Sequence, residues 1–183
     1  MSLSIKPTPF PDVLILEPKV FSDERGFFFE SFNKQNFNLQ TGLDINFVQD
    51  NHSKSVRGVL RGLHYQIQHP QGKLTRVTFG CVYDVVVDLR QSSKDFGKWI
   101  GVELSAENQR QLWIPPGFAH GFLVLTEFAE FLYKTTDYWY PKHERTLLWS
   151  DPKLGIKWPS VENYIVSAKD AEGLSLREAD KFD

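Results

Sequence analysis

Two residues with the chemistry of an active site lie three positions apart in the stretch Val59 to Gln66, which is otherwise typical of a buried β-strand. Burying a cation is costly unless its charge is paired, so Arg61 is expected to bind an anion. His64 carries an imidazole whose unperturbed pKa of about 6.5 suits a general base near neutrality. A surface ion pair for the arginine and a hydrogen-bonded core position for the histidine are the alternatives, and this stretch by itself leaves them open.

The backbone between these two residues must be irregular if both are to serve one site. Successive side chains of a strand alternate between its faces, so positions 61 and 64 fall on opposite sides of a regular strand. Gly62 lies between them and suits a β-bulge, in which one extra residue shifts the alternation. A bulge at Gly62 would bring Arg61 and His64 to the same side.

Other polar side chains lie in strand-like surroundings. Asp84 and Asp88 share one face of the run from Val82 to Leu89. Because burying both carboxylates is costly, that face is expected to be exposed or to be polar for a reason. Tyr133 belongs to an aromatic stripe of the kind that usually forms core, yet its hydroxyl could donate a proton opposite a basic histidine. Lys73 follows a turn, and its local sequence predicts a surface position.

No cofactor signature accompanies these residues. The sequence has no glycine-rich phosphate loop and no dinucleotide fingerprint, so side chains would have to hold any nucleotide. A first-row metal needs three or four clustered ligands, whereas the histidines are widely spaced and neither an H-x-H nor a C-x-x-C pair is present. We therefore expect no metal and no cofactor.

Composition limits the class of protein. The 183 residues are 41% hydrophobic and 24% charged, which is ordinary for a globular domain, and we expect one domain over residues 1–183. A net charge of -2 argues against nucleic-acid binding by phosphate neutralisation. Charges interrupt every apolar stretch, so no membrane span is expected. Cys81 is the single cysteine and no N-terminal leader is seen, which favours a cytoplasmic location.

Short strands dominate the pattern along the chain. About ten apolar runs separated by Gly, Pro, Asp and Asn, with little helical periodicity, predict an all-β sandwich or barrel. One short helix is expected over residues 33–39, and a second over the tail from Ser167 to Asp180. The expected strands are 13–16, 26–30, 45–49, 77–79, 82–89 (after a turn at Gly80), 99–104, 111–114, 121–125, 130–136 and 146–149.

Several separated motifs resemble one enzyme family, the dTDP-4-dehydrorhamnose 3,5-epimerases. The resemblance runs from about Val13 to Asp170, and the motifs occur in the family's order. They are DERGFFFE (23–30), FVQDNHS (47–53), LRGLH (60–64), QLWIP (111–115), GFAHGF (117–122), FLYK (131–134) and SAKD (167–170).

The resemblance implies a fold and a reaction. The fold would be a cupin-type jelly roll with a core over about 13–150 and a tail over 151–183 that packs back, in a homodimer with exchanged N-terminal strands. The reaction would be cofactor-independent inversion of C3 and C5 of dTDP-4-dehydro-6-deoxy-D-glucose, giving dTDP-4-dehydro-L-rhamnose. Both carbons flank the C4 ketone, which acidifies their protons.

The resemblance also assigns roles to residues. His64 would be the base, Asp170 would orient it, Tyr133 would be the acid, and Lys73 would stabilise the enolate at O4. Trp139 stands where the family commonly has a tyrosine that stacks on thymine, and a larger ring should preserve the stacking. The remaining substrate contacts would be Arg25, Glu30, Gln49, Asn51, Arg61, His120, Glu144 and Lys169.

Three alternatives remain beside this hypothesis. A single-position epimerase, inverting only C3 or only C5, would retain most of the same residues. A metal-dependent cupin oxygenase would need a ligand cluster that the sequence lacks. A non-catalytic sugar-nucleotide binder would need neither His64 with Asp170 nor Tyr133.

Overall fold

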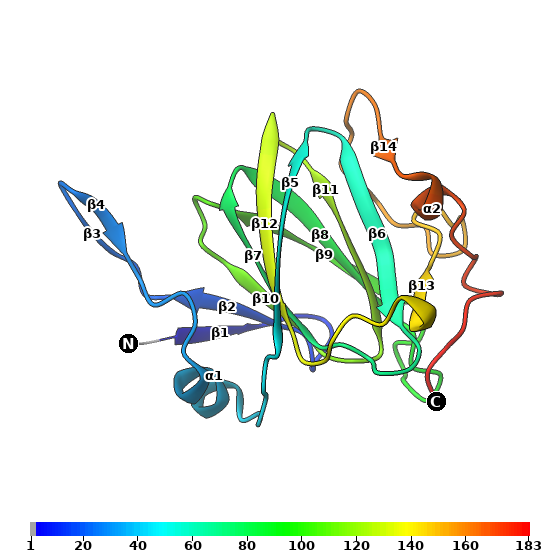
Figure 1. Cartoon of the computed structure of the whole chain (residues 1–183), viewed down its shortest axis with the longest axis horizontal. Coiled ribbons are helices and arrows are strands. Elements are labelled where there is room, and N and C mark those ends of the chain that lie inside the picture. The colour runs from blue at the N-terminus through cyan, green and yellow to red at the C-terminus, as the bar shows by residue number, and fades with distance from the viewer. Residues whose placement is uncertain (1–2) are drawn as a thin grey trace.

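Two β-sheets packed face to face form the body of the computed structural model, which describes residues 3–183 (Figure 1). The first sheet has the order β1 (Leu3–Pro7), β2 (Leu14–Pro18), β10 (Gln111–Ile114), β7 (Lys73–Phe79), β12 (Phe128–Thr135) and β5 (Gln49–Val56). The second has the order β13 (Glu144–Thr146), β6 (Val59–Gln66), β11 (Phe118–Val124), β8 (Cys81–Asp88) and β9 (Trp99–Ser105), with β14 (Ile165–Val166) beside β6.

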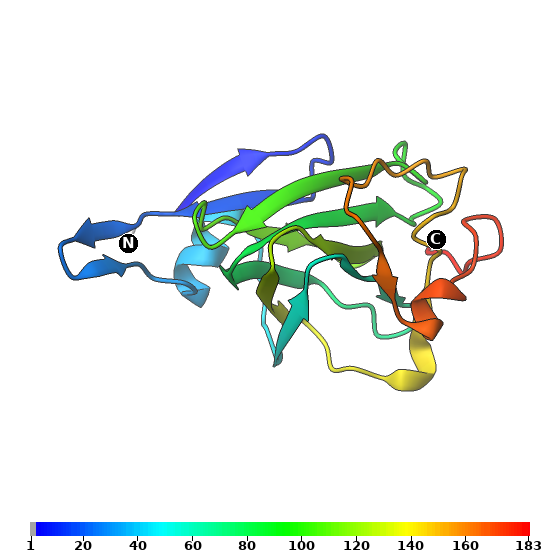
Figure 2. The ribbon, with the colours of Figure 1, turned by 90° about the horizontal axis from the view of Figure 1, so that it is seen from above.

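This sandwich confirms the predicted all-β, jelly-roll class, and the view from above shows the two layers (Figure 2). The predicted turn at Gly80 is also present, with the positive φ of 73° that glycine accommodates. Two predicted strands are displaced: β5 begins where the run 45–49 was expected to end, and β13 ends where the run 146–149 was expected to begin. Among residues 3–183 no helix is long and apolar enough to cross a membrane.

A separate hairpin projects from the body of the molecule (Figure 1). It pairs β3 (Phe21–Asp23) with β4 (Gly26–Phe28), where one strand over 26–30 was predicted. The chain then enters α1 (Lys34–Thr41), which confirms the predicted first helix. Asn33 caps its N-terminus by accepting a hydrogen bond from the N–H of Asn36, and Gly42 ends it in the left-handed region.

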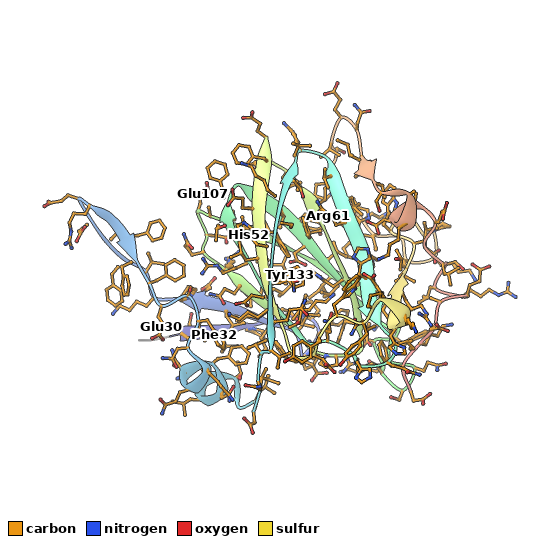
Figure 3. All side chains as sticks on the ribbon, viewed as in Figure 1. Glu30, Phe32, His52, Arg61, Glu107 and Tyr133 are labelled. Carbon is orange, nitrogen blue, oxygen red and sulfur yellow. The ribbon has the colours of Figure 1, made fainter. Side chains whose placement is uncertain are left out.

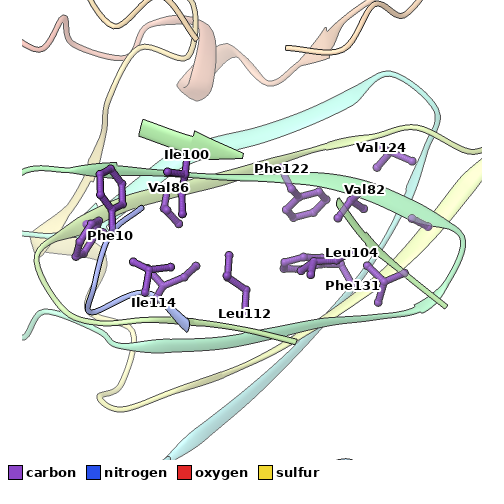
Figure 4. Close-up of a cluster of buried hydrophobic side chains, with 14 residues drawn as sticks. Phe10, Val82, Val86, Ile100, Leu104, Leu112, Ile114, Phe122, Val124 and Phe131 are labelled. Atoms are coloured by element: carbon purple, nitrogen blue, oxygen red, sulfur yellow. The ribbon is translucent and has the colours of Figure 1, made fainter. Parts of the chain in front are cut away.

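Three apolar clusters hold the layers together. The first fills one end of the space between the sheets, where Val86 and Phe122 face Leu112 and Phe131 (Figure 4). The second, which includes Leu63, lies between the outer face of the second sheet and the tail. In the third, Phe37 of α1 packs on the outer face of the first sheet, against Leu16, Leu74 and Trp113 of its strands.

The tail contains less helix than predicted. Between residues 167 and 180 only α2 (Ala168–Ala171) is helical, and a 3-10 turn, η1 (Pro141–His143), lies earlier in the chain. After α2 the backbone is bridged to the segment after β13 at Leu174, which exchanges hydrogen bonds with Thr146 and Leu148, and it then turns over residues 175–179. Gly173 permits this close approach, since a Cβ there would lie 2.9 Å from the backbone N of Leu148. The prediction of a helix to Asp180 was therefore wrong beyond residue 171.

Candidate active site

A cavity of about 350 Å³ opens at the other end of the space between the sheets. Strands of both sheets contribute to its lining, so one end of the sandwich interior is apolar and the other is polar. The predicted site residues that line it are Gln49, Asn51, Arg61, His64, Lys73, His120, Tyr133, Trp139 and Glu144.

The predicted bulge in β6 is present, and it places Arg61 and His64 on the same side of the strand. His64 lies opposite His120 of β11, whereas Arg61 lies opposite Phe122, so three steps on β6 match two on β11. Gly62 has a φ of 121°, a region that side chains rarely adopt. The shift lets Arg61 and His64 both line the cavity.

His64 is held by a carboxylate from the tail. Its Nε2 lies 2.5 Å from Oδ1 of buried Asp170, whose other oxygen accepts a hydrogen bond from the N–H of Gly62 at 3.3 Å. Burial alone would raise the pKa of Asp170, but the hydrogen bond to His64, its charge and the Gly62 N–H together hold that pKa below its ordinary value. With Nε2 donating to the carboxylate, Nδ1 is the ring nitrogen left to accept a proton.

A second imidazole–carboxylate pair lies beside the first. Nε2 of His120 is 2.6 Å from Oδ1 of Asp84, and the Thr75 hydroxyl donates to Oδ2 at 3.1 Å. Both residues of the pair are buried. Burial lowers the pKa of His120 despite the nearby carboxylate, so this imidazole is neutral at pH 7.

Sequence reasoning left Asp84 out of the predicted site. It did flag Asp84 and Asp88 as a face that is exposed or polar for a reason, and both carboxylates are buried and paired. Asp88 has a structural partner in Arg90, at 2.8 Å. Asp84 contacts His120, which lines the cavity. An aspartate at a buried strand position is costly unless it has a partner, and this feature of the sequence could have indicated that Asp84 belongs to the site.

Lys73 is buried, so the surface position predicted from its local sequence was wrong. Its ammonium group donates to the carbonyl of His64 at 3.2 Å. Burial lowers the pKa of Lys73 to about 8, against the opposing charges of Asp84 and Glu144. The group is therefore a cation at neutral pH, yet it is poorly hydrated and strongly interacting.

Tyr133 lines the cavity from the first sheet, whereas His64 lines it from the second. On β12 it is paired with Asn51 on one side and Thr75 on the other. Burial raises the pKa of the Tyr133 phenol, with Glu144 acting in the same direction and Arg61 against it. The phenol therefore keeps its proton at neutral pH and can donate it.

Charged and aromatic side chains form the rim of the cavity. Arg61 donates through Nε to the hydroxyl of Ser55 at 3.0 Å. Lys169 lies beside Asp170 in α2, and its Nζ is 2.5 Å from the Glu144 carboxylate. Trp139 is half exposed in the segment between β12 and η1.

Two predicted contact residues lie outside the cavity of their own chain. Arg25 is in the turn of the β3–β4 hairpin, with its side chain 85% exposed and paired with Asp23. Glu30 follows the hairpin and accepts a hydrogen bond from Asn33, away from Arg61 and Tyr133 (Figure 3). The structure therefore does not bring Arg25 and Glu30 together with the other predicted residues.

No group of three or more His, Cys, Asp or Glu side chains within residues 3–183 is arranged to hold a metal ion. The polar groups of the cavity are instead arranged in pairs, each imidazole with one carboxylate. Such an arrangement can remove a proton, donate one from the other wall, and stabilise negative charge near Lys73.

Comparisons with known proteins agree with this arrangement. The sequence model of one family, described as dTDP-4-dehydrorhamnose 3,5-epimerase, matches residues 7–178. The dTDP-4-dehydrorhamnose 3,5-epimerase of Pseudomonas aeruginosa is 60% identical over 172 residues, covering 94% of this chain and 95% of that protein.

Solved structures resemble the whole chain. A dTDP-6-deoxy-D-glucose-3,5-epimerase from Legionella pneumophila, in complex with dTDP-4-keto-L-rhamnose, has a TM-score of 0.96 at 50% identity, covering 98% of this chain and 95% of that one. A 3'-monoepimerase from Streptomyces bikiniensis, in complex with dTDP-quinovose, has a TM-score of 0.88 at 34% identity, covering 93% and 87%.

Proposed function

The chain belongs to the dTDP-4-dehydrorhamnose 3,5-epimerase family, and from this premise we propose that it inverts C3 and C5 of dTDP-4-dehydro-6-deoxy-D-glucose to give dTDP-4-dehydro-L-rhamnose. One observation carries the proposal: His64 and Tyr133 line one cavity from opposite sheets. Inversion requires a proton to leave one face of a carbon and return to the other, which two groups on opposite walls can do.

The base in this proposal is His64. Its Nδ1 takes the proton from C3 or C5 of the sugar. The electron pair of the broken C–H bond forms a double bond between that carbon and C4, and the C4 carbonyl becomes an enolate. Asp170 keeps the imidazole in the tautomer that accepts at Nδ1 and stabilises the imidazolium that forms, as their 2.5 Å contact supports. Lys73 stabilises the enolate oxygen, a charge that develops only along the reaction.

Reprotonation comes from Tyr133. Its raised pKa supports a phenol that holds its proton until the enolate forms. The proton then passes to the opposite face of the carbon, and the C4 carbonyl is restored. His120 lies opposite His64 in the same sheet, and because its Nε2–H is used by Asp84, its Nδ1 is left to accept a hydrogen bond from a substrate hydroxyl.

The rest of the substrate is a nucleoside diphosphate. We assign the pyrophosphate to Arg61 and Lys169, because guanidinium and ammonium groups suit phosphate oxygens. Gln49 and Asn51 supply hydrogen bonds, Glu144 holds Lys169 at the rim, and Trp139 stacks on the base.

We further propose that the protein is a homodimer in which the hairpin of one protomer reaches the cavity of the other. This would give Arg25 and Glu30 the substrate contacts that they cannot make within their own chain. Phe21, Phe27 and Phe28 support the proposal, because these large apolar side chains are exposed on the hairpin. The single cysteine, Cys81, is a free thiol, in keeping with action in the cytoplasm.

A single-position epimerase is the second candidate, since the 3'-monoepimerase shares this fold. Deuterium exchange distinguishes the two. In D₂O, NMR of the substrate should show exchange and inversion at both H3 and H5 if the protein is a 3,5-epimerase. Exchange at one carbon alone would favour the second candidate.

The same assay tests the roles of the two facing residues. His64→Asn should lose exchange and inversion together, by about 10²- to 10⁴-fold, because no enolate forms. Tyr133→Phe should keep exchange on the original face but lose inversion at one or both carbons. Full activity of His64→Asn would refute the mechanism, and normal inversion by Tyr133→Phe would assign the acid to another group.

A chelator tests the expectation that no metal is needed. The reaction drawn above uses only protein side chains, so the rate should be unchanged after incubation with EDTA. An activity lost to EDTA and restored by a divalent ion would show that the enzyme uses a metal.

A further inference from the structure

We propose that Gln66 is a positioning residue, whose side-chain amide holds Trp139 at the mouth of the cavity and thereby sets the affinity for the nucleotide. The inference deepens the proposed function and rests on it, because Trp139 is taken as the surface on which the base stacks. Gln66 was not among the residues predicted for the site.

Gln66 ends β6 and is 3% exposed. Its amide makes three hydrogen bonds, all to backbone groups of the two segments that border the mouth. Nε2 donates to the carbonyls of His69 at 2.7 Å and Tyr138 at 3.2 Å, and Oε1 accepts from the N–H of Tyr140 at 2.6 Å. One buried side chain thus ties together the loop after β6 and the segment after β12.

The bonds to Tyr138 and Tyr140 lie on either side of Trp139. An amide that accepts from one residue and donates to the residue two positions earlier reproduces the pairing of a neighbouring strand. Segment 137–140 is neither helix nor strand, so it lacks a ladder of its own. The N–H of Trp139 itself donates to Oε1 of Gln49 at 3.1 Å, within the same cavity.

The position of Trp139 depends on these hydrogen bonds, because the residue is not held by packing. The residue is 54% exposed, and its neighbours Tyr138 and Tyr140 are also exposed. A half-exposed ring binds a stacked base more tightly when its backbone is already held, since ordering it on binding would cost affinity. We infer that the polar bonds beneath the segment supply this order.

Neither methionine nor glutamate can replace the amide at position 66. Glutamine offers one acceptor oxygen and two N–H donors, and all three are used here. Methionine has a similar length but leaves two carbonyls and one N–H without their partner. Glutamate keeps the acceptor for Tyr140 and loses both donors.

The positioning role predicts a change in binding with little change in chemistry. For Gln66→Met we expect the KM for dTDP-4-dehydro-6-deoxy-D-glucose and the Kd for dTDP to rise about 10-fold, which corresponds to about 1.4 kcal/mol. The kcat should stay within about 3-fold, since His64 and Tyr133 lie on strands whose register is unaffected. Hydrogen–deuterium exchange in segment 137–143 should become faster.

A double-mutant cycle shows whether Gln66 acts through Trp139. Trp139→Ala should weaken dTDP binding, and adding Gln66→Met to it should cause little further loss. Thr126→Val is the control, because it removes two hydrogen bonds to backbone groups, of Cys81 and Phe128, in a turn outside the cavity lining. It should change the unfolding temperature but not the dTDP affinity.

Two results would overturn the inference: an unchanged Kd for dTDP in Gln66→Met, or an equal further loss in the Trp139→Ala background. If Gln66→Met does not fold, Gln66→Glu provides the same measurement of dTDP affinity and exchange. Binding of dTDP does not need the reaction, so the two proposals can fail separately. If the wild-type protein lacks epimerase activity but Gln66→Met still weakens dTDP binding as predicted, the proposed function is refuted and the positioning role is not.

Discussion

At the residue scale, a buried carboxylate opposes the effect of burial on two neighbouring basic side chains. Asp84 is fully buried, is paired with His120, and opposes the burial that lowers the pKa of Lys73, so that the resulting pKa is about 8. Lys73 can stabilise an enolate as a cation only while it is protonated, which is the case below its pKa. Its contribution should therefore be present at neutral pH and be lost as the pH rises through about 8.

The variant Asp84→Asn should move this loss to lower pH. Removing the carboxylate removes a charge that favours the protonated amine, so the pKa of Lys73 falls further. We expect the alkaline limb of the pH profile of kcat/KM, near pH 8 in the wild type, to shift downward. Asp50→Asn is a matched control, because Asp50 is exposed and paired with Lys134 instead. An unshifted limb in Asp84→Asn would mean that another group governs it.

Local sequence predicted some of these residues and failed for others. Arg61, His64 and the bulge between them follow from strand alternation, which is a local rule. Lys73 does not, because its burial depends on strands that bring His64 and Asp84 to it from elsewhere in the chain. Asp170 is 106 residues from His64, and only the family resemblance assigned it to the site.

At the scale of elements, apolar alternation did not predict a strand whose inward side chains line the cavity. β5 was missed as a strand over 49–56 because its inward positions are Gln49, Asn51 and Ser53, which line the cavity and are polar. Apolar alternation marks strands that face a core, such as β8, which was predicted at nearly its observed position. The polar residues that form the site therefore remove the apolar alternation by which β5 could have been predicted as a strand.

The bulge in β6 offers a test at this scale. In Gly62→Ala a Cβ would lie 2.6 Å from the Cα of Gly121, in addition to the cost of a positive φ. Gly26→Ala is the matched control, with a φ of 123° and open space around the added Cβ.

Strain at a positive φ costs about 1–3 kcal/mol, so both variants should unfold at lower denaturant concentration. Gly62→Ala should be the less stable of the two and should also lose activity, because His64 would move. Equal midpoints for the two variants, with full activity in Gly62→Ala, would show that the bulge tolerates a side chain.

At the scale of the whole molecule, the β3–β4 hairpin projects from the body, and its Arg25 does not line the cavity of its own chain. Its exposed phenylalanines and the distance of Arg25 from its own cavity lining both favour a second protomer. Light scattering at micromolar concentration should give twice the chain mass of 21.2 kDa. Phe27→Ser with Phe28→Ser should shift this toward the monomer, whereas Ile165→Ser, which alters an equally apolar exposed residue on β14, should not.

Mixed dimers test whether Arg25 serves the partner's cavity. Arg25→Ala and His64→Asn should each be nearly inactive alone. In a mixed dimer, the chain that keeps His64 receives Arg25 from its partner, so activity should return when the two are refolded together. If Arg25 instead served its own chain, no cavity of the mixture would be complete and activity would stay low.

The division of the site between strands and the loops at its mouth has a consequence for how such proteins diversify. The groups assigned to proton transfer lie on paired strands, apart from Asp170, whereas Trp139 lies on a segment held by side-chain amides. Substitutions in that segment disturb little of the core. We therefore expect the range of accepted sugar nucleotides to drift readily under selection, while the reaction itself is inherited unchanged.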